Sequence, residues 1–299
     1  MMENPSLNIG VIGIRGAWST ESLREHLVKK NAGGTIIQLD EMSYDFTTGK
    51  AFLNHHDLAE FDGFIIKKMG KNYSSNLLDE LELLELFERQ GVRFFSSPKA
   101  IRKMISRLSC TVRLHENDIP MPATFVTEDI DDAVAWVTAN APVIVKPLYS
   151  TKARGMLLLT DEAVARKHFV EMQAQNNNII YLQKYYDLSG SDYGLVFLAG
   201  EYLGAYARVG DGSTWHTTTR QGGKYSLYEP APELIKLAER AQAPFGLDFT
   251  CVDIAVTKEV GPVVFEVSAF GGYKGLFAST GLDASDLLTD YAIRKLAND

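Results

Sequence analysis

The first third of the chain alternates short apolar runs with segments of helical periodicity, and this alternation restricts the fold more than any other feature. The apolar runs, which predict strands, cover residues 7–14, 35–39, 61–67 and 92–95. Leucine and phenylalanine at helical spacing in residues 76–90 predict a helix that ends at Gly91. Because strands that alternate with helices form parallel sheets, we expect a small parallel βα domain over residues 1–97.

Beyond residue 97 the pattern changes to mixed helices and strands, which we divide into two α+β lobes at residues 98–186 and 187–299. The first lobe begins with one long helix over residues 100–117, and a strand that ends at Lys146 pairs with the apolar run that follows the next loop. The second lobe is mostly β at its start and closes with a helix over residues 282–296. The predicted fold class is therefore α/β followed by α+β.

Net charge and cysteine content limit the function classes. The 299 residues carry a formal net charge of −8, which argues against a broad nucleic-acid surface but allows a local basic cleft. Two cysteines cannot form a disulfide framework, and their scarcity fits a reducing compartment. No apolar run approaches the roughly 18 residues of a membrane span, and residues 1–7 lack the apolar core of a signal peptide. We therefore expect a cytoplasmic protein with no membrane and no nucleic-acid partner.

A β-hairpin is predicted near the C-terminus, where two β-rich segments flank a four-residue loop at residues 258–261. Such a loop pairs Thr257 with Pro262, and counting four residues away along each strand brings Asp253 opposite Glu266. Opposed carboxylates destabilise a hairpin unless a cation lies between them, and carboxylates suit Mg²⁺ that is also bound by phosphates. The alternative, two solvated carboxylates on an exposed face, stays open on periodicity alone.

A second chemical feature follows Lys146, which ends a predicted strand and precedes a basic loop at residues 149–155. The chain has no G-x-x-x-x-G-K-[ST] motif, so a P-loop is excluded. A strand-end lysine followed by small residues whose N–H groups curl around an anion predicts a phosphate clamp, although an exposed basic hairpin is the alternative. Arg220 either grips a substrate carboxylate with two N–H donors or is a surface arginine.

These features occur in the order and spacing of the ATP-grasp enzymes. The matching positions are Lys146 with its loop, Gln183-Lys-Tyr-Tyr186, Asp192, Arg208, Asp253 and Glu266-Val-Ser268. Over residues 60–297 the chain resembles the RimK-like glutamate ligases, and the glutathione synthetases are more distant. The resemblance implies an ATP-grasp fold whose two α+β lobes clasp ATP, with ATP and Mg²⁺ as cofactors and Mn²⁺ as an alternative metal.

The resemblance also implies roles for individual residues. Lys146 and Arg208 take catalytic roles, and Arg220 joins them as the candidate substrate clamp. The implied metal ligands are Asp253, Glu266 and Ser268, which agrees with the hairpin pairing. The implied nucleotide-binding residues are Arg107, Lys146, Ser150, Thr151, Lys152, Arg154, Gly155, Gln183, Lys184, Tyr185, Tyr186, Asp192, His216 and Thr218.

Several of these positions depart from the family pattern. The substituted positions are Arg107, Ser150, Ala153, Lys184, His216, Thr218 and Ser268. Ser150 and Ala153 replace glycines, which stiffens the loop, and Arg107 replaces a phosphate-binding lysine with a group of different geometry. The substitutions indicate a divergent subfamily.

The implied activity is the ATP-dependent joining of a carboxylate to an amine through an acyl phosphate. Glutamate or a similar amino acid is the group added, and the substrates are small molecules or peptides. Two alternatives stay open, namely a kinase that phosphorylates a small hydroxyl substrate and a nucleotide-binding scaffold with weak catalysis. A dimer is common in relatives, so a homodimer or higher homo-oligomer is expected.

The proposed chemistry makes two spatial predictions. Residues 150–155 and 271–275 are expected to form lid and substrate loops, because an acyl phosphate must be kept from water. The basic residues are expected to gather at one cleft in this acidic protein, where they attract the nucleotide. These residues are Arg107, Lys146, Lys152, Arg154, Lys184, Arg208 and Arg220.

Overall fold

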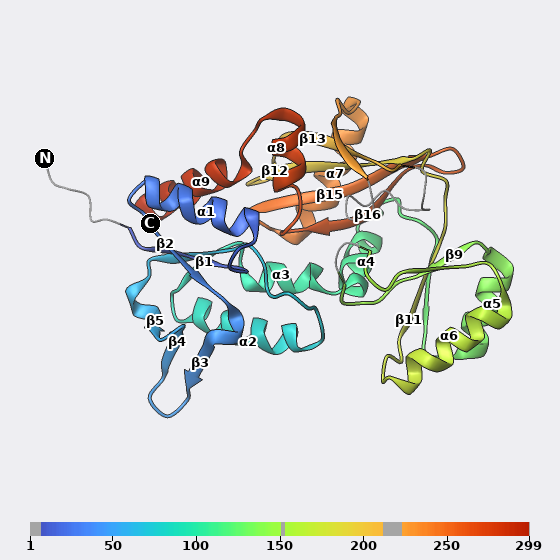
Figure 1. Ribbon diagram of the computed structural model, residues 1–299, viewed down its shortest axis with the longest axis horizontal. Coiled ribbons are helices and arrows are strands. Elements are labelled where there is room, and N and C mark those ends of the chain that lie inside the picture. The colour runs from blue at the N-terminus through green and yellow to red at the C-terminus, as the bar shows by residue number, and fades with distance from the viewer. Residues whose placement is uncertain (1–6, 151–152, 212–222, 299) are drawn as a thin grey trace, which may run out of the picture.

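The N-terminal sheet is parallel, as the alternating pattern predicts. The computed structural model describes residues 7–150, 153–211 and 223–298 (Figure 1). The sheet has the strand order β2-β1-β6-β7. Its strands are β1 (Ile9–Ile12), β2 (Gly33–Ile37), β6 (Gly63–Ile66) and β7 (Arg93–Phe95). All three pairings in it are parallel.

The two helices of this unit pack on opposite faces of the sheet. Side chains alternate between the faces of a strand, so Ile65 packs with α1 (Trp18–Lys29) and Phe64 packs with α2 (Asn76–Arg89). Between β2 and β6 the chain forms a small antiparallel sheet that the sequence pattern did not predict. Its strands are β3 (Met42–Asp45), β4 (Lys50–Leu53) and β5 (His56–Asp57), and the short helices η1 (Leu39–Glu41) and η2 (Leu58–Glu60) flank it along the chain.

The middle lobe contains a four-stranded sheet with the order β10-β9-β11-β8. Its elements are β8 (Thr124–Thr127), α5 (Ile130–Asn140), β9 (Val143–Val145), β10 (Leu157–Leu159), α6 (Glu162–Ala174) and β11 (Ile180–Lys184). The predicted pairing across the basic loop is confirmed, because β9 and β10 are antiparallel neighbours. Both helices pack on one apolar core centred on Phe169 and Leu182.

The third sheet is antiparallel and has the order β14-β13-β12-β15-β16. Its strands are β12 (Ser191–Leu198), β13 (Glu201–Val209), β14 (Lys224–Leu227), β15 (Phe249–Thr257) and β16 (Gly261–Ser268). The helices α7 (Pro232–Gln242) and η4 (Ala243–Phe245) lie between β14 and β15 along the chain. The helical segment α7–η4 ends at Gly246, whose φ of +65° suits glycine. In Figure 1 this sheet lies above the N-terminal sheet, and the middle lobe lies to the right.

The prediction of one long helix over residues 100–117 is wrong. The chain forms α3 (Pro98–Ile105) and α4 (Arg107–Glu116), separated by Ser106 in an extended conformation. The break is stabilised from outside the helix, because the Arg107 N–H donates to the Leu148 carbonyl at 2.9 Å. This turn starts α4 next to the loop that follows β9.

The C-terminal segment contains two helices, of which the sequence pattern predicted only the last. The prediction of a substrate loop at residues 271–275 is wrong for residues 273–275, because α8 (Tyr273–Thr280) begins at Tyr273. The final helix α9 (Ala284–Asn298) packs beside α1, so the two ends of the described chain lie together (Figure 1). No helix in the described stretches combines the length and the apolar character that crossing a membrane requires.

Candidate active site

A cleft of about 880 Å³ is lined by all three parts of the fold. This volume is within the usual range for small-molecule sites. The middle lobe contributes the ends of β9 and β11, the third sheet contributes its charged face, and the N-terminal unit contributes Lys68 and Tyr73. The predicted site residues that line the cleft are Arg107, Lys146, Ser150, Lys184, Tyr185, Tyr186, Asp192, Arg208, Asp253, Glu266 and Ser268.

The hairpin β15–β16 brings Asp253 directly opposite Glu266, as the pairing argument predicts. The predicted turn is wrong, however, because Thr257 pairs with Gly261 rather than with Pro262. A register shift between Asp253 and Ile254 offsets this difference of one residue. Both carboxylates therefore lie on neighbouring strands at the cleft.

Arg208 lies between two carboxylates. Its Nε donates to Asp192 Oδ1 at 2.6 Å, and its Nη2 lies 3.1 Å from Asp253 Oδ2. Burial raises the pKa of Asp253 to about 6, although the Arg208 charge opposes this change. Burial would lower the pKa of Arg208, but Asp253 and Asp192 outweigh it and raise that pKa. Arg208 therefore stays charged and holds both acids in place.

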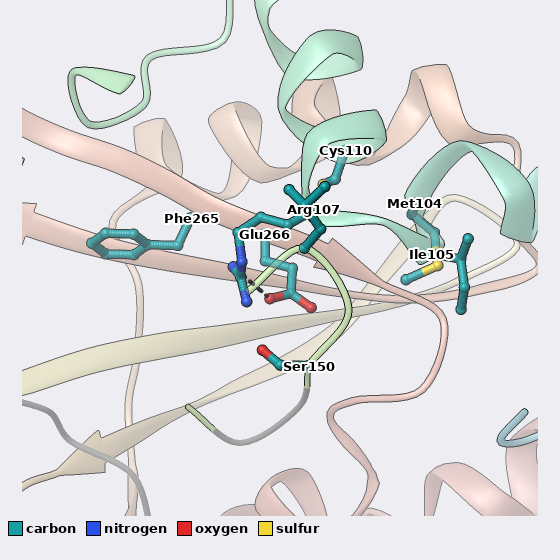
Figure 2. Close-up of a pocket in the computed structure, with 8 residues that line it drawn as sticks. Met104, Ile105, Arg107, Cys110, Ser150, Phe265 and Glu266 are labelled. Carbon is teal, nitrogen blue, oxygen red and sulfur yellow. Dashed lines mark ion pairs between the residues drawn. The ribbon is translucent and has the colours of Figure 1, made fainter. Parts of the chain in front are cut away.

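Glu266 is paired with an arginine from a different element. Arg107 reaches it from the start of α4, and its Nη1 lies 3.6 Å from Glu266 Oε2 (Figure 2). The Arg107 Nε also donates to the Pro147 carbonyl at 3.2 Å, which fixes the guanidinium beside the strand-end loop. Ser150 lies near this pair, and its buried hydroxyl has no hydrogen-bond partner among the described residues. A polar group that is buried without a partner is available for a ligand.

Lys146 is the buried cation of the site. It follows β9 directly, and its Nζ donates to Gln183 Oε1 on β11. The Gln183 amide in turn donates to Thr124 Oγ1 at 3.1 Å, so a short polar chain orients the lysine. Burial, with a smaller contribution from Arg107, lowers the pKa of Lys146 to about 7. A bound anion would therefore stabilise the charged form of Lys146.

The chain after β11 leaves a backbone donor at the cleft. The Lys184 N–H donates to the Ala123 carbonyl at 2.8 Å, and the Tyr185 N–H donates to the Pro142 carbonyl at 3.0 Å. The next N–H, of Tyr186, donates to no described residue. This segment can therefore offer a hydrogen bond to the edge of a planar ligand.

The cleft is also lined by residues that the sequence analysis did not assign. They include Lys68, Tyr73, Tyr206, Lys224, Tyr225, Phe270 and Ala278. Lys274, which was expected in the substrate loop, lines the cleft from the start of α8. One signal in the sequence was available, because Lys67 and Lys68 follow a buried parallel strand and ligands bind at the carboxyl ends of such strands. The aromatic residues gave no comparable signal, since their spacing is also that of core residues.

Several predicted positions do not line the cleft. Arg154 is exposed, and its Nη2 donates to the Lys71 carbonyl at 3.2 Å on the N-terminal unit. Gln183 is buried behind Lys146, and Gly155 occupies a turn with a φ of +72°. The positions that lie outside the described residues are Thr151, Lys152, His216, Thr218 and Arg220. Four of the five described basic residues that were expected at one cleft therefore line it, and Arg154 does not.

The donors at the hairpin fit a hard divalent cation. Asp253 and Glu266 offer carboxylate oxygens from facing strands, and the Ser268 hydroxyl lies on the same side of β16, where it accepts the Phe270 N–H at 3.1 Å. Two carboxylates and a hydroxyl are too few for a complete octahedral set, which suits Mg²⁺ that is shared with substrate phosphates. Among the described residues, no cluster of three or more His, Cys, Asp or Glu side chains has the geometry of a metal site.

This arrangement of lobes and charges is that of an ATP-grasp protein, and comparison with known families identifies the branch. Residues 105–292 match the RimK-like ATP-grasp domain. The chain therefore belongs to the RimK-like ATP-grasp family, whose named relatives are ligases, and it is an enzyme of the ligase class.

Two curated relatives illustrate the similarity. A probable alpha-L-glutamate ligase of Parasynechococcus marenigrum is 27% identical over 213 residues, which cover 70% of this chain and 45% of the relative. The chain thus spans less than half the length of that relative. The tetrahydromethanopterin:alpha-L-glutamate ligase of Methanococcus maripaludis is 23% identical over 292 residues, which cover 96% of this chain and 98% of the relative.

A solved structure confirms the fold. The ATP-grasp ligase PsnB, in complex with a phosphomimetic variant of its minimal precursor, Mg and ADP, superposes with a TM-score of 0.75. The superposition covers 98% of this chain and 100% of PsnB at 17% sequence identity. At this level of identity the likeness shows the fold alone.

Proposed function

We propose that the protein joins a carboxylate to an amine with ATP, through an acyl phosphate, and adds glutamate or a similar amino acid. The observation that carries the proposal is the convergence of Lys146, Arg107 and Arg208 with the facing carboxylates Asp253 and Glu266 in one cleft. The relatives named glutamate ligases and the PsnB complex with Mg and ADP support it.

Each of these residues has a role that follows from its position in the cleft. The Tyr186 N–H and the walls of the cleft near β11 bind the adenine. Lys146 and Arg107 hold the phosphates, and Arg208 steadies the charge that develops as the substrate carboxylate attacks the γ-phosphorus. Asp253, Glu266 and Ser268 would hold Mg²⁺, with Mn²⁺ as an alternative, and the ion would supply positive charge to the phosphate oxygens.

The second half of the reaction forms the amide. The amine attacks the carbonyl carbon of the acyl phosphate, the C–O bond to phosphate breaks, and inorganic phosphate leaves. The amine loses its proton to solvent or to the departing phosphate, so no side-chain base is required. The acceptor is a small molecule or a peptide, and the precursor bound to PsnB supports the peptide form.

The proposal is tested by measuring ADP release and trapping with hydroxylamine. With ATP, Mg²⁺ and L-glutamate or other acids, a ligase converts hydroxylamine to a hydroxamate. A kinase forms no hydroxamate and releases ADP only when a hydroxyl substrate is supplied, and a scaffold binds ATP but releases no ADP with any acid or hydroxyl compound. Either of the last two results would replace the ligase proposal.

A pair of variants tests the assignment of Glu266 as a metal ligand. We expect Glu266→Gln to reduce metal-dependent ADP release at least about a hundredfold, because a charged ligand to the cation is lost. Glu259→Gln is the matched control, because Glu259 lies in the exposed turn of the same hairpin. Unchanged turnover in Glu266→Gln would remove Glu266 from the metal site.

A further inference from the structure

Lys67 is a buried lysine that the proposed reaction does not use. It follows β6 in the N-terminal sheet, and only 3% of its surface is exposed. Its backbone is fixed by the sheet, because the Lys67 N–H donates to the Ile12 carbonyl at 2.8 Å. Burying a charged group is unfavourable unless it is well paired, so a lysine here needs a compensating contact.

The contact that compensates for burial is made to a distant part of the chain. The Lys67 Nζ donates to the Phe270 carbonyl at 2.6 Å and lies 4.2 Å from the centre of the Tyr273 ring. A hydrogen bond from an ammonium group and a cation–π contact are both stronger than their neutral counterparts. Lys67 thus joins the N-terminal sheet to the segment that connects β16 with α8.

This segment forms one wall of the cleft. Phe270, Gly271 and Gly272 line the cleft, and Lys274 and Ala278 on the following helix continue the wall. The segment follows Ser268 closely, and Tyr73 from the N-terminal unit contacts the Phe270 ring edge-on at 6.5 Å between centroids. The backbone that holds the adenine in the proposed function follows β11 in the middle lobe, and this wall belongs to the segment between β16 and α8.

We propose that Lys67 is a positioning residue, which holds the Phe270–Gly272 segment in the place where the acid and amine substrates lie against it. The proposal rests on the proposed ligase function for its kinetic consequences. The contact itself can be tested without turnover. Lys67 does not line the cleft, so it acts through the wall and not by touching the substrate.

The test compares three variants. Lys67→Met keeps an unbranched side chain that is only one atom shorter but removes the charge and the donor, whereas Lys67→Arg keeps both the charge and the donor. Lys103→Met is the matched control, because Lys103 also donates to backbone carbonyls, those of Pro244 and Phe245 at 3.3 Å, but does so outside the cleft. Binding of MgADP, steady-state ADP release with L-glutamate, and hydrogen exchange are measured for each variant.

Hydrogen exchange reports on the wall directly. We expect amides in residues 269–276 to exchange faster in Lys67→Met than in the wild type, and Lys103→Met to leave these amides unchanged. Lys67→Arg should restore most of the protection. Unchanged exchange over residues 269–276 in Lys67→Met would overturn the proposal, whether or not a substrate has been found.

The kinetic readout separates positioning from general destabilisation. We expect the KM for L-glutamate to rise about tenfold in Lys67→Met, as for loss of one charge-assisted hydrogen bond, with the Kd for MgADP unchanged within about twofold. A parallel loss of MgADP binding would overturn the proposal, because only a general structural role predicts it. If the wild type releases no ADP with any acid, the proposed function fails, and the exchange experiment alone decides the role of Lys67.

Discussion

Each acidic group at the centre of the cleft lies beside an arginine. Arg208 contacts Asp192 and Asp253, and Arg107 contacts Glu266. These ion pairs offset the desolvation cost of the carboxylates. Without the arginines, charged carboxylates would be unfavourable at these positions. Lys146 differs from them, because its hydrogen-bond partner is the neutral amide of Gln183.

Lys146 gives the site a testable proton linkage. Burial lowers its pKa to about 7, so at pH 8 most of the free protein carries the neutral amine. Bound phosphates favour the charged form and raise the pKa, so MgADP binding should take up close to one proton at pH 8. At pH 6 the lysine is already charged, so the part of the proton uptake that comes from Lys146, taken as the difference between the wild type and Lys146→Met, should fall toward zero.

This linkage is measured by titration calorimetry in buffers that differ in ionisation enthalpy. Lys146→Met should bind MgADP about a hundredfold more weakly and show no proton uptake at pH 8, while Lys103→Met keeps both properties of the wild type. Equal uptake in the wild type and in Lys146→Met would assign the proton to another group.

At the level of elements, the β15–β16 hairpin shows which features the sequence could predict and which it could not. The pattern of strands and loop predicted Asp253 opposite Glu266, and the structure has this pair. The predicted turn was one residue too long, and a register shift restored the pairing. Periodicity cannot reveal such a shift, since a bulge leaves the alternation intact on each side of it.

Two other elements were missed for different physical reasons. The break at Ser106 depends on a hydrogen bond from Arg107 to Leu148, and such a distant partner leaves no local trace in the sequence. Helix α8 follows two glycines, which predicted a loop. Gly272 instead acts as the N-terminal boundary of the helix with a φ of +87°.

The glycines at the two ends of α8 provide a matched pair of variants. Gly272 and Gly281 both have positive φ values, of +87° and +76°. A Cβ atom at Gly272 would lie 2.9 Å from Val196 Cγ2, whereas one at Gly281 meets nothing within 4 Å. We expect Gly281→Ala to lower the free energy of unfolding by about 1 kcal/mol, and Gly272→Ala by about 2–4 kcal/mol.

Urea denaturation measures both variants under the same conditions. The difference between them isolates the steric clash from the backbone strain that they share. Equal losses in the two variants would show that the chain relaxes around a Cβ at Gly272, and the close packing of this turn on β12 would then have no energetic role.

At the level of the whole molecule, polar contacts and ion pairs join the first helix to the C-terminal segment that contains the last. The ring nitrogens of His26 lie 2.9 Å from Asp283 and 3.1 Å from Asp286. Lys30 lies 2.8 Å from Asp286 and also contacts Asp290. The hydrogen bond from Lys30 lowers the pKa of Asp286, so this carboxylate stabilises the folded state at neutral pH.

The corresponding prediction concerns Asp286→Asn. Because the pKa of Asp286 is lowered by folding, its contribution is present at pH 7 and is lost as the pH falls through the lowered value. The group is partly exposed, so we expect a loss of only about 0.5–1 kcal/mol at pH 7, which shrinks at pH 3 and in 1 M NaCl. Thermal or urea unfolding of Asp286→Asn provides the measurement.

A control for this prediction is Glu116→Gln, which removes a local surface pair with Arg113 within α4. It should change the free energy of unfolding by less than about 0.5 kcal/mol. A loss in Asp286→Asn that persists unchanged at pH 3 would mean that packing of the side chain, and not its charge, joins the two helices.

The sequence was most informative where the order of motifs along the chain mattered, and least informative where distant segments meet. Strand-end Lys146 and the hairpin acids could be predicted because each belongs to a local pattern. Lys67 and Tyr73 could not be assigned in the same way, because their importance depends on Phe270, which lies about 200 residues further along. Such contacts are fixed by the tertiary fold and leave no periodic signal.

The packing of α9 on α1 has a consequence for synthesis of the chain. His26 contacts Asp283 across 257 residues, and Leu23 and Leu27 share an apolar core with Leu288. At roughly 5–20 residues per second, a ribosome needs on the order of 10–50 seconds to make the intervening chain. During that interval the part of α1 that packs on Leu288 lacks its native cover, so apolar surface of the nascent N-terminal unit stays exposed until α9 has been made.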